Sequence, residues 1–383
     1  MNRLNQLTEI HQSGKPYIIY KSKKGFNLYT NFSKRIILNN KNIKSFLSKK
    51  NKKKSKDTDL FIGFFGYELL NNLIDVKIPK QKNLNFPKGI FYKPEKKIKL
   101  SNKLNYDYKN FKSGNFKINI NRKNYTKIFN KFKKKIKSGE TYQIKICTKY
   151  KTKSKINPLD FFSRLSKTNL APEAFMIKDH NYSIISCSPE TLITKKGSDI
   201  STKPIAGTVK KTKHLNKMKA LNYFRKNLKE TKEHNMIVDM ERNDLSRICK
   251  VGTVKLSKQK IVEEYKDLFH YVSLIKGKLK KNINNFQIIK AMMPGGSVIG
   301  CPKINTLNLL NNQEKENRNI YTGSFGYIKF NGDMRFNIII RSILNFKNIS
   351  EISVASGVVV DSNANHEFNE NFLKAKALID LFK

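Results

Sequence analysis

The sequence predicts an α+β fold in which antiparallel strands and helices pack together. Three observations support this prediction. Apolar segments separated by turns follow one another near the C-terminus, at 323–330, 336–344 and 352–361, and predict hairpin strands. Apolar residues at helical spacing predict helices over 124–139 and 215–240. The sequence shows no repeat of fixed period, so a solenoid or propeller is not expected.

The remaining elements follow in chain order. Residues 1–120 predict short strands and turns with lysine-rich interruptions, of which 48–57 is expected to be a solvated loop. In FIGFFGYELL (61–70), Gly63 and Gly66 predict a strand that approaches another backbone closely before a helix begins. We expect strands at 142–150 and 182–187, the end of the 124–139 helix at Gly139, and a last helix from about His366.

The composition favours a folded, strongly basic protein. With 383 residues, of which 38% are hydrophobic, the chain can form two or three domains or one large domain, and wholesale disorder is excluded. The net charge of +48 raises the alternative of a nucleic-acid-binding protein, but only ten of the 77 basic residues are arginine. Lysine, asparagine and isoleucine are abundant together, which is typical of an A+T-rich coding sequence. No nucleic-acid partner is therefore expected.

The cysteines and the N-terminus indicate the cellular compartment. Cys147, Cys187, Cys249 and Cys301 form no CxxC pair, so we expect reduced, mostly buried thiols rather than a zinc site or disulfides. The N-terminus lacks the apolar stretch of a signal peptide, and no run approaches the roughly 18 apolar residues that span a bilayer. The expectation is a soluble, cytoplasmic protein without a membrane partner.

Acidic residues are scarce, and they cluster in two places. One cluster, in KEHNMIVDMERNDL (232–245), includes Glu233, and the other, HEFNE, places Glu367 and Glu370 three residues apart on one helix face. Carboxylates from two helices can converge on a hard cation such as Mg²⁺, which completes its shell with water and an anionic substrate. The alternative from spacing alone is that these acids are exposed or paired in salt bridges.

Other strings could receive an anion. MPGGSVIGCPK (293–303) is a glycine-rich turn whose backbone N–H groups could bind a carboxylate or phosphate, although it lacks Walker A spacing and could be a plain turn. Arg341 lies within an apolar strand pattern, where a guanidinium needs an anionic partner such as a substrate carboxylate. His270 is a candidate acid or base, or a hydrogen-bonded core histidine.

Taken in order, a set of strings resembles the chorismate-utilising enzymes, the family of anthranilate synthase component I and aminodeoxychorismate synthase component I. The strings are SGETYQ, SPETL, KPIAGT, EHNMIVDMERNDL, PGGSVIGCPK, YTGSFGYI, IIIRS, ASGVVVDS and HEFNENFLKAKAL. The resemblance is dense over 121–383 and loose before it, chiefly at GFFGYEL. It implies two packed antiparallel β-sheets forming a sandwich with flanking helices, in which 1–120 completes the sandwich and 121–383 is the chorismate-binding catalytic region.

The resemblance also implies roles for single residues. Glu233 and Glu370, with Glu367 beside them, match positions that hold Mg²⁺, which grips the ring carboxylate of chorismate. The positions expected to bind the rest of the substrate are Ser297, Tyr321, Arg341, Gly357 and Lys374. His270 matches the active-site histidine of the family and Glu190 its general acid or base. Ala206 and Thr208, in KPIAGT, match the remaining catalytic positions.

The resemblance suggests the nucleophile as well. Isochorismate and salicylate synthases resemble this chain but carry a water-activating lysine where it has Gln143, and a neutral amide cannot deprotonate water. Ammonia is then the expected nucleophile. None of the four cysteines lies in a GxCxG-type string, so the chain resembles a synthase subunit that receives ammonia from a separate glutamine amidotransferase.

Two products stay open. The PGGS loop, the short chain and the lack of an LLES-like element resemble the aminodeoxychorismate branch, which leads to p-aminobenzoate and folate. Ala206 instead resembles anthranilate synthases, because enzymes of the first branch carry a covalently acting lysine there. If aminodeoxychorismate is the product, either ammonia reacts without a lysyl intermediate or another amine, such as Lys145 or Lys203, replaces the missing one.

Overall fold

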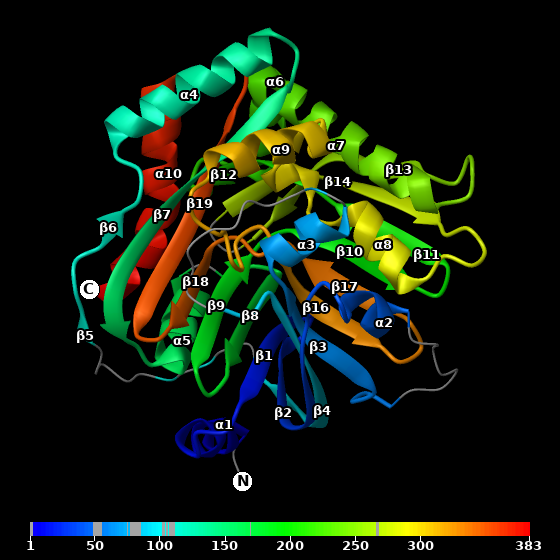
Figure 1. The fold of residues 1–383 in the computed structure, drawn as a ribbon, viewed down its shortest axis with the longest axis vertical. Helices are drawn as coiled ribbons and strands as arrows, with labels where there is room; N and C mark the ends of the chain where they lie inside the picture. Colours follow the sequence, from blue (N-terminus) through cyan, green and yellow to red (C-terminus); the bar gives the residue numbers. More distant parts are fainter. Residues whose placement is uncertain are drawn as a thin grey trace.

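The computed structural model confirms the α+β class (Figure 1). It describes residues 3–48, 56–74, 76, 86–101, 104, 106, 112–168, 170–265 and 268–383, so most of the lysine-rich run at 48–57 lies outside the described residues. Every strand pairing within these residues is antiparallel. No described helix is both long and apolar enough to cross a membrane.

The strands form two halves that meet at β4 (Gly89–Leu100), which pairs with β2 (Gly25–Ile37) and with β3 (Leu60–Phe65). From β2 the first half continues through β1 (Tyr17–Ser22), β8 (Glu173–Lys178), β9 (Tyr182–Ser188), β18 (Ser342–Phe346), β19 (Ile349–Val358) and β7 (Gln143–Lys155). Beside β7 lie the short strands β5 (Lys112–Ser113), β6 (Lys117–Ile118) and β15 (Gly300–Cys301).

The second half continues from β3 in the other direction. It runs through β16 (Ser324–Lys329), β17 (Met334–Asn337), β10 (Thr191–Lys196), β11 (Asp199–Lys203) and β14 (Leu268–Lys278). β14 also pairs with β12 (Ile205–Lys210) and β13 (Lys255–Glu264). Strands from the first 120 residues therefore pair with strands far along the chain, in both halves.

An apolar core lies between the two halves. It combines side chains from β1, β8 and β9 of the first half with side chains from β3 and β16 of the second. Phe175 and Phe325 stack across this core with ring centroids 3.7 Å apart. Burial of such aromatic surface is the main contribution that joins the halves into a sandwich.

Helices cover the outer faces. The first half packs against α1 (Arg3–Gln12), α5 (Pro158–Thr168) and α10 (Ala364–Ile379), which ends in a short turn, Asp380–Phe382. The second half packs against α2 (Ile43–Leu47), α3 (Tyr67–Leu73), α7 (Leu228–Ile248) and α8 (Asn285–Met292). α4 (Arg122–Lys137) and α9 (Lys303–Gln313) pack on β7, and α6 (Lys217–Lys226) packs on β13 and β14.

Two elements that were predicted to be continuous are interrupted in the structure. The helix expected over 215–240 is two helices, because Asn227 leaves the helical conformation and its side chain accepts the Glu230 N–H to cap α7. The strand expected over 336–344 is interrupted at 338–341, between β17 and β18. Arg341, in this interruption, has a φ of +51°, a conformation that costs free energy for a side chain other than glycine.

Candidate functional site

A cavity of about 440 Å³ opens where the ends of several elements meet. Its walls come from β7, β12, β19, α7 and α10, from the loop before β10, from the short turn Gly296–Val298 and from the interruption at 338–341. Predicted site residues that line it are Glu190, Ala206, Thr208, Glu233, Ser297, Tyr321, Arg341, Gly357, Glu367, Glu370 and Lys374. His270 is the one predicted site residue that does not line it.

Three carboxylates lie on one side of this cavity. Glu233 comes from α7, whereas Glu367 and Glu370 come from α10. The ligand atoms of His366, Glu367 and Glu370 all lie within 4.8 Å of one another. Such oxygen-rich donors fit a hard divalent cation, and Glu233 can add a ligand from a second helix. The residues present therefore fit the Mg²⁺ that the sequence predicts.

Each of these carboxylates is held by protein donors. The Glu233 Oε1 atom accepts hydrogen bonds from Gln143 Nε2 at 2.7 Å and from Lys145 Nζ at 2.9 Å. Glu367 accepts from Ser362 Oγ at 2.9 Å, and Glu370 pairs with Lys374 at 2.6 Å. Burial would raise the pKa of Glu233, yet Lys145 and Gln143 bring it below the ordinary value. Glu233 is therefore ionised at neutral pH.

Glu190 has a different environment. It lies in the two-residue loop between β9 and β10, and its carboxylate accepts a hydrogen bond from Ser297 Oγ at 2.8 Å. Burial raises its pKa to about 7, although Ser297 and Lys145 act in the opposite direction. A carboxyl group with this pKa can donate or accept a proton near neutral pH.

Arg341 faces the cavity with its charge uncompensated. Its guanidinium has no hydrogen bond or ion pair to any residue that the structure describes, and burial lowers its pKa. Hydrogen bonds fix the backbone around it, from Ser186 Oγ to the Ile340 carbonyl at 3.1 Å and from Cys187 N to the Arg341 carbonyl at 3.2 Å. A partly buried, unpaired guanidinium on a fixed backbone is a site for an anion.

The KPIAGT segment forms another wall. Ala206 presents only a methyl group to the cavity, and Thr208 hydrogen-bonds through Oγ1 to His270 Nδ1 at 2.8 Å. Burial, aided by Arg341, lowers the pKa of His270 to about 4, so the ring is neutral at pH 7. His270 thus contacts the site through Thr208. Lys203 is not part of the cavity wall and pairs with Glu263 at 2.7 Å.

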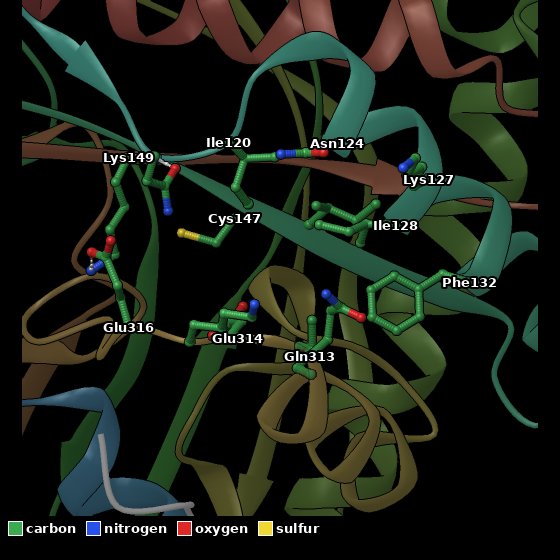
Figure 2. A pocket seen from close by; sticks show the side chains of 14 residues that line it. Ile120, Asn124, Lys127, Ile128, Phe132, Cys147, Lys149, Gln313, Glu314 and Glu316 are labelled. Carbon is green, nitrogen blue, oxygen red and sulfur yellow. Dashed lines mark hydrogen bonds and ion pairs between the residues drawn. The ribbon is translucent and has the colours of Figure 1, made fainter. Parts of the chain in front are cut away.

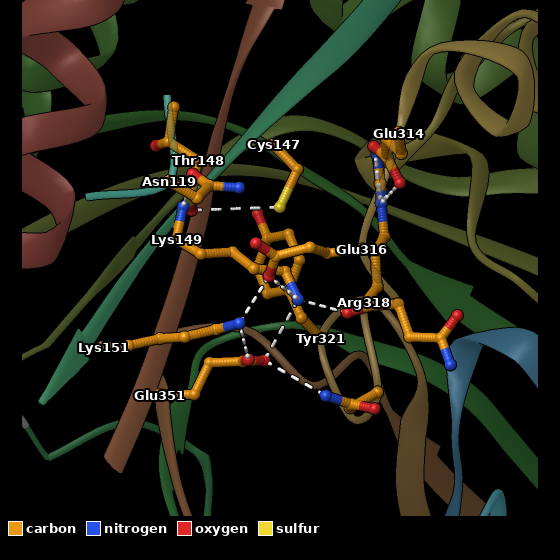
Figure 3. Close-up of polar contacts among 12 residues, drawn as sticks. Asn119, Cys147, Thr148, Lys149, Lys151, Glu314, Glu316, Arg318, Tyr321 and Glu351 are labelled. Carbon is orange, nitrogen blue, oxygen red and sulfur yellow. Dashed lines mark hydrogen bonds and ion pairs between the residues drawn. The ribbon is translucent and has the colours of Figure 1, made fainter. Parts of the chain in front are cut away.

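A group of charged residues adjoins Tyr321, one of the residues that line the cavity (Figure 3). Arg318, almost fully buried, pairs with Glu314 at 2.5 Å and donates to the Lys145 carbonyl at 3.2 Å. Its guanidinium also lies 5.9 Å from the ring centroid of Tyr321, which lines the cavity. Arg318 therefore fixes both the β7 backbone at Lys145 and the ring of Tyr321.

A second cavity, of about 400 Å³, lies between α4, β7 and the end of α9 (Figure 2). It is lined by apolar side chains of α4, such as Ile128 and Phe132, and by Cys147 and Lys149 of β7. Lys149 is occupied by Glu351, at 3.3 Å, and by the Asn317 carbonyl (Figure 3). Among the described residues, the two cavities share no lining residue.

Two residues were not singled out by the sequence analysis. His366 lies beside the predicted ligands, and its spacing of four residues from Glu370, on one helix face, could have identified it. Glu241 is fully buried on α7, and its Oε1 atom has no hydrogen-bond partner in the described part of the chain. Its position within an acidic, polar string gave no signal of burial. All four cysteines are free, as expected, and three are buried.

Comparison with known proteins agrees with this architecture. Residues 104–380 match the family described as chorismate binding enzyme. Aminodeoxychorismate synthase component 1 of Bacillus subtilis is 34% identical over 70% of this chain, and an anthranilate synthase component I-like protein of Synechocystis is 31% identical over 83%. The matched stretches cover 57% and 72% of those relatives, so the chain spans little more than half of the first.

A solved structure supports the same conclusion. Anthranilate synthase component I from Streptococcus pneumoniae superposes with a TM-score of 0.77 at 25% identity, covering 95% of this chain and 92% of that one. The sandwich fold and the acid-lined cavity define an enzyme scaffold of the anthranilate synthase type. The chain belongs to the chorismate-binding enzymes.

Proposed function

We propose that this protein is an aminodeoxychorismate synthase component I, which aminates chorismate to 4-amino-4-deoxychorismate with ammonia from a glutamine amidotransferase partner. The observation that carries the proposal is the arrangement of charge in the cavity. Carboxylates suited to a cation lie on one side, and an unpaired guanidinium lies on another wall. Chorismate has two carboxylates, so a cation and Arg341 can each bind one.

In this proposal Glu233 and Glu370, with Glu367 and His366 beside them, would hold Mg²⁺, which would supply positive charge for the ring carboxylate. Arg341 and Tyr321 receive the second carboxylate. Ser297 and Gly357 shape the wall between the two ends. Glu190, with a pKa of about 7, donates a proton to the departing hydroxyl, which leaves as water. Ammonia forms the new C–N bond at the carbon that the hydroxyl leaves, and the proton that it loses returns to Glu190.

Gln143 supports ammonia rather than water as the nucleophile. Its amide nitrogen donates to Glu233, so the side chain positions a carboxylate and offers no basic group. Hydration would require a base at this position. A dedicated ammonia supply is consistent with the absence of a glutaminase-type cysteine string from the sequence.

Anthranilate synthesis is the second candidate, because of one observation. Ala206 lines the cavity at the position where the aminodeoxychorismate branch carries a reactive lysine. A methyl group cannot form a covalent intermediate, so amination here proceeds without a covalent bond to residue 206.

The test is to incubate the purified protein with chorismate, Mg²⁺ and ammonium, and to identify the product by mass and fluorescence. Aminodeoxychorismate, which a lyase converts to p-aminobenzoate, supports the proposal. Fluorescent anthranilate favours the second candidate. Chorismate left unchanged by the wild type, under conditions where an established relative converts it, contradicts both.

A further inference from the structure

Lys145 lies inside the candidate active site, close to the predicted metal ligands. It projects from β7 into the cavity, and only 13% of its side chain is exposed. Its Nζ atom lies 2.9 Å from Glu233 Oε1. On the neighbouring strand, a Cβ atom at Gly357 would lie only 2.6 Å from Nζ, so the glycine leaves the space that the ammonium group occupies.

The charges around Lys145 explain why it stays protonated. Burial alone would lower its pKa, but Glu233, and then Glu370 and Glu367, raise it above the ordinary value. Lys145 in turn lowers the pKa of Glu190 on another wall. One ammonium group therefore acts on four of the carboxylates that line the cavity.

We propose that Lys145 is a built-in counter-ion that competes with the divalent cation for Glu233. The ammonium group and Gln143 both donate to one oxygen atom of Glu233, so a cation must displace the ammonium or bind close to a like charge. The ammonium group thereby offsets part of the negative charge of these carboxylates when no cation is bound. The inference depends on the proposed function only for the presence of a cation site.

A consequence is that the cation and an anionic substrate enter together. Lys145 weakens the attraction of the carboxylates for a cation alone, whereas an added anion restores the negative charge. The second lysine of the cavity differs from the first. Lys374 pairs with Glu370 on the same helix, and 43% of its side chain is exposed, so water screens its charge.

The experiment measures Mn²⁺ binding by electron paramagnetic resonance, without chorismate or ammonia. Lys145→Met keeps an unbranched side chain of similar length and removes the charge. We expect this variant to bind Mn²⁺ at least about tenfold more tightly than the wild type. Lys374→Met is expected to show a smaller gain, and Lys203→Met, whose lysine pairs with Glu263 outside the cavity, no change. Equal or weaker Mn²⁺ binding by Lys145→Met overturns the inference.

Two further measurements keep the result decisive. If Lys145→Met does not fold, as circular dichroism would show, Lys145→Gln removes the charge but keeps a donor for Glu233, and the same gain is expected. Glu233→Gln should weaken Mn²⁺ binding, and its failure to do so also overturns the inference. Turnover of chorismate by the wild type is tested separately. Its absence, together with the tighter binding by Lys145→Met, contradicts the proposed function and leaves the inference supported.

Discussion

The chemistry available to Glu190 depends on its burial. Removing a carboxyl group from water disfavours its charged form, and here the effect exceeds the opposing contributions of Ser297 and Lys145. Glu233, whose side chain is 21% exposed, stays ionised because two donors contact one of its oxygen atoms directly. Two glutamates in one cavity are thus tuned in opposite directions, one for proton transfer and one for binding positive charge.

Glu190→Gln is expected to lower kcat by about 100-fold or more, because an amide cannot donate the required proton. In the wild type, Glu190 must be protonated, so kcat/KM for chorismate should fall as the pH rises above about 7. The measurement is the pH dependence of the rate for both proteins. If kcat/KM of Glu190→Gln is reduced but still falls as the pH rises, a group other than Glu190 causes that fall.

Arg341→Met is expected to raise KM for chorismate by about 10- to 100-fold, since charge-assisted hydrogen bonds to one carboxylate would be lost. The cavity offers that carboxylate no equivalent unpaired cation among the residues described. Steady-state kinetics measure the effect. Arg242→Lys, an exposed change on α7, is the control and should leave KM unchanged. An unchanged KM for Arg341→Met would exclude Arg341 from substrate binding.

For single residues, the sequence predicted which positions belong to the site better than it predicted the contacts between them. The positions of Glu190, Glu233, Arg341 and Glu370 followed from motifs, and all four line one cavity. The contact of Lys145 with Glu233 could not be predicted, because the residues are 88 positions apart and meet only when β7 and α7 pack. His270, also expected in the site, does not line the cavity and hydrogen-bonds to Thr208, which does.

Among the elements, α7 carries two groups of acids on its inward face. Near its N-terminal end Glu233 reaches the cavity, and farther along the helix Glu241 and Asp244 are buried. Asp244 pairs with Lys303, whereas Glu241 accepts one hydrogen bond, from Thr202 Oγ1 at 3.0 Å. Burial raises the pKa of Glu241 to about 8, and Asp244 and Glu190 act in the same direction against Lys303.

Glu241→Gln is therefore expected to stabilise the protein at alkaline pH. The pKa of Glu241 in the unfolded chain is about 4.3, so between that pH and about 8 the unfolded state loses its proton and the folded state keeps it. Stability is lost as the pH rises through this range. The variant escapes this loss, and its advantage in the free energy of unfolding should grow by roughly 2–3 kcal/mol between pH 5.5 and 8.

Denaturant titrations at the two pH values measure this advantage. Asp239→Asn, an exposed change on the same helix, is the control and should alter the free energy of unfolding by less than about 0.5 kcal/mol at either pH. A pH-independent effect of Glu241→Gln would mean that Glu241 is ionised in the folded protein.

Helices with regular apolar spacing were predictable, whereas interruptions were not. α4 ends at Lys137, followed by the C-cap residue Ser138 and by Gly139 with its φ of +79°, as the sequence indicates. The break at Asn227 depends on a cap, and asparagine is common enough that none was expected there. The interruption at 338–341 has a strongly apolar sequence typical of a strand. Tertiary hydrogen bonds from β9 hold it out of the sheet.

In the whole molecule, β4 joins the two halves of the sandwich, and the path of the chain explains why the sequence could not give the strand order. β3 pairs with β16, from more than 250 residues later, and β1 pairs with β8. Such pairings depend on complementary surfaces formed during folding rather than on local pattern. The alternation of apolar segments with turns predicted that strands exist. The resemblance to a family predicted that they form a sandwich, but not their order.

The crossing at β4 is expected to be the place where a small change disturbs the whole molecule. A Cβ atom at Gly63 of β3 would lie 1.9 Å from the Ile90 carbonyl oxygen of β4, and backbone atoms cannot move aside as a flexible side chain can. Gly63→Ala should lower the free energy of unfolding by about 1–3 kcal/mol or more. Because β3 also pairs with β16, which follows the segment bearing Tyr321, chorismate turnover should fall with stability. Gly114→Ala is the matched control, since its nearest neighbour, Thr152 Oγ1, would lie at an ordinary 3.6 Å. Equal thermal unfolding temperatures for the two variants would show that β3 and β4 can separate without disturbing the sandwich.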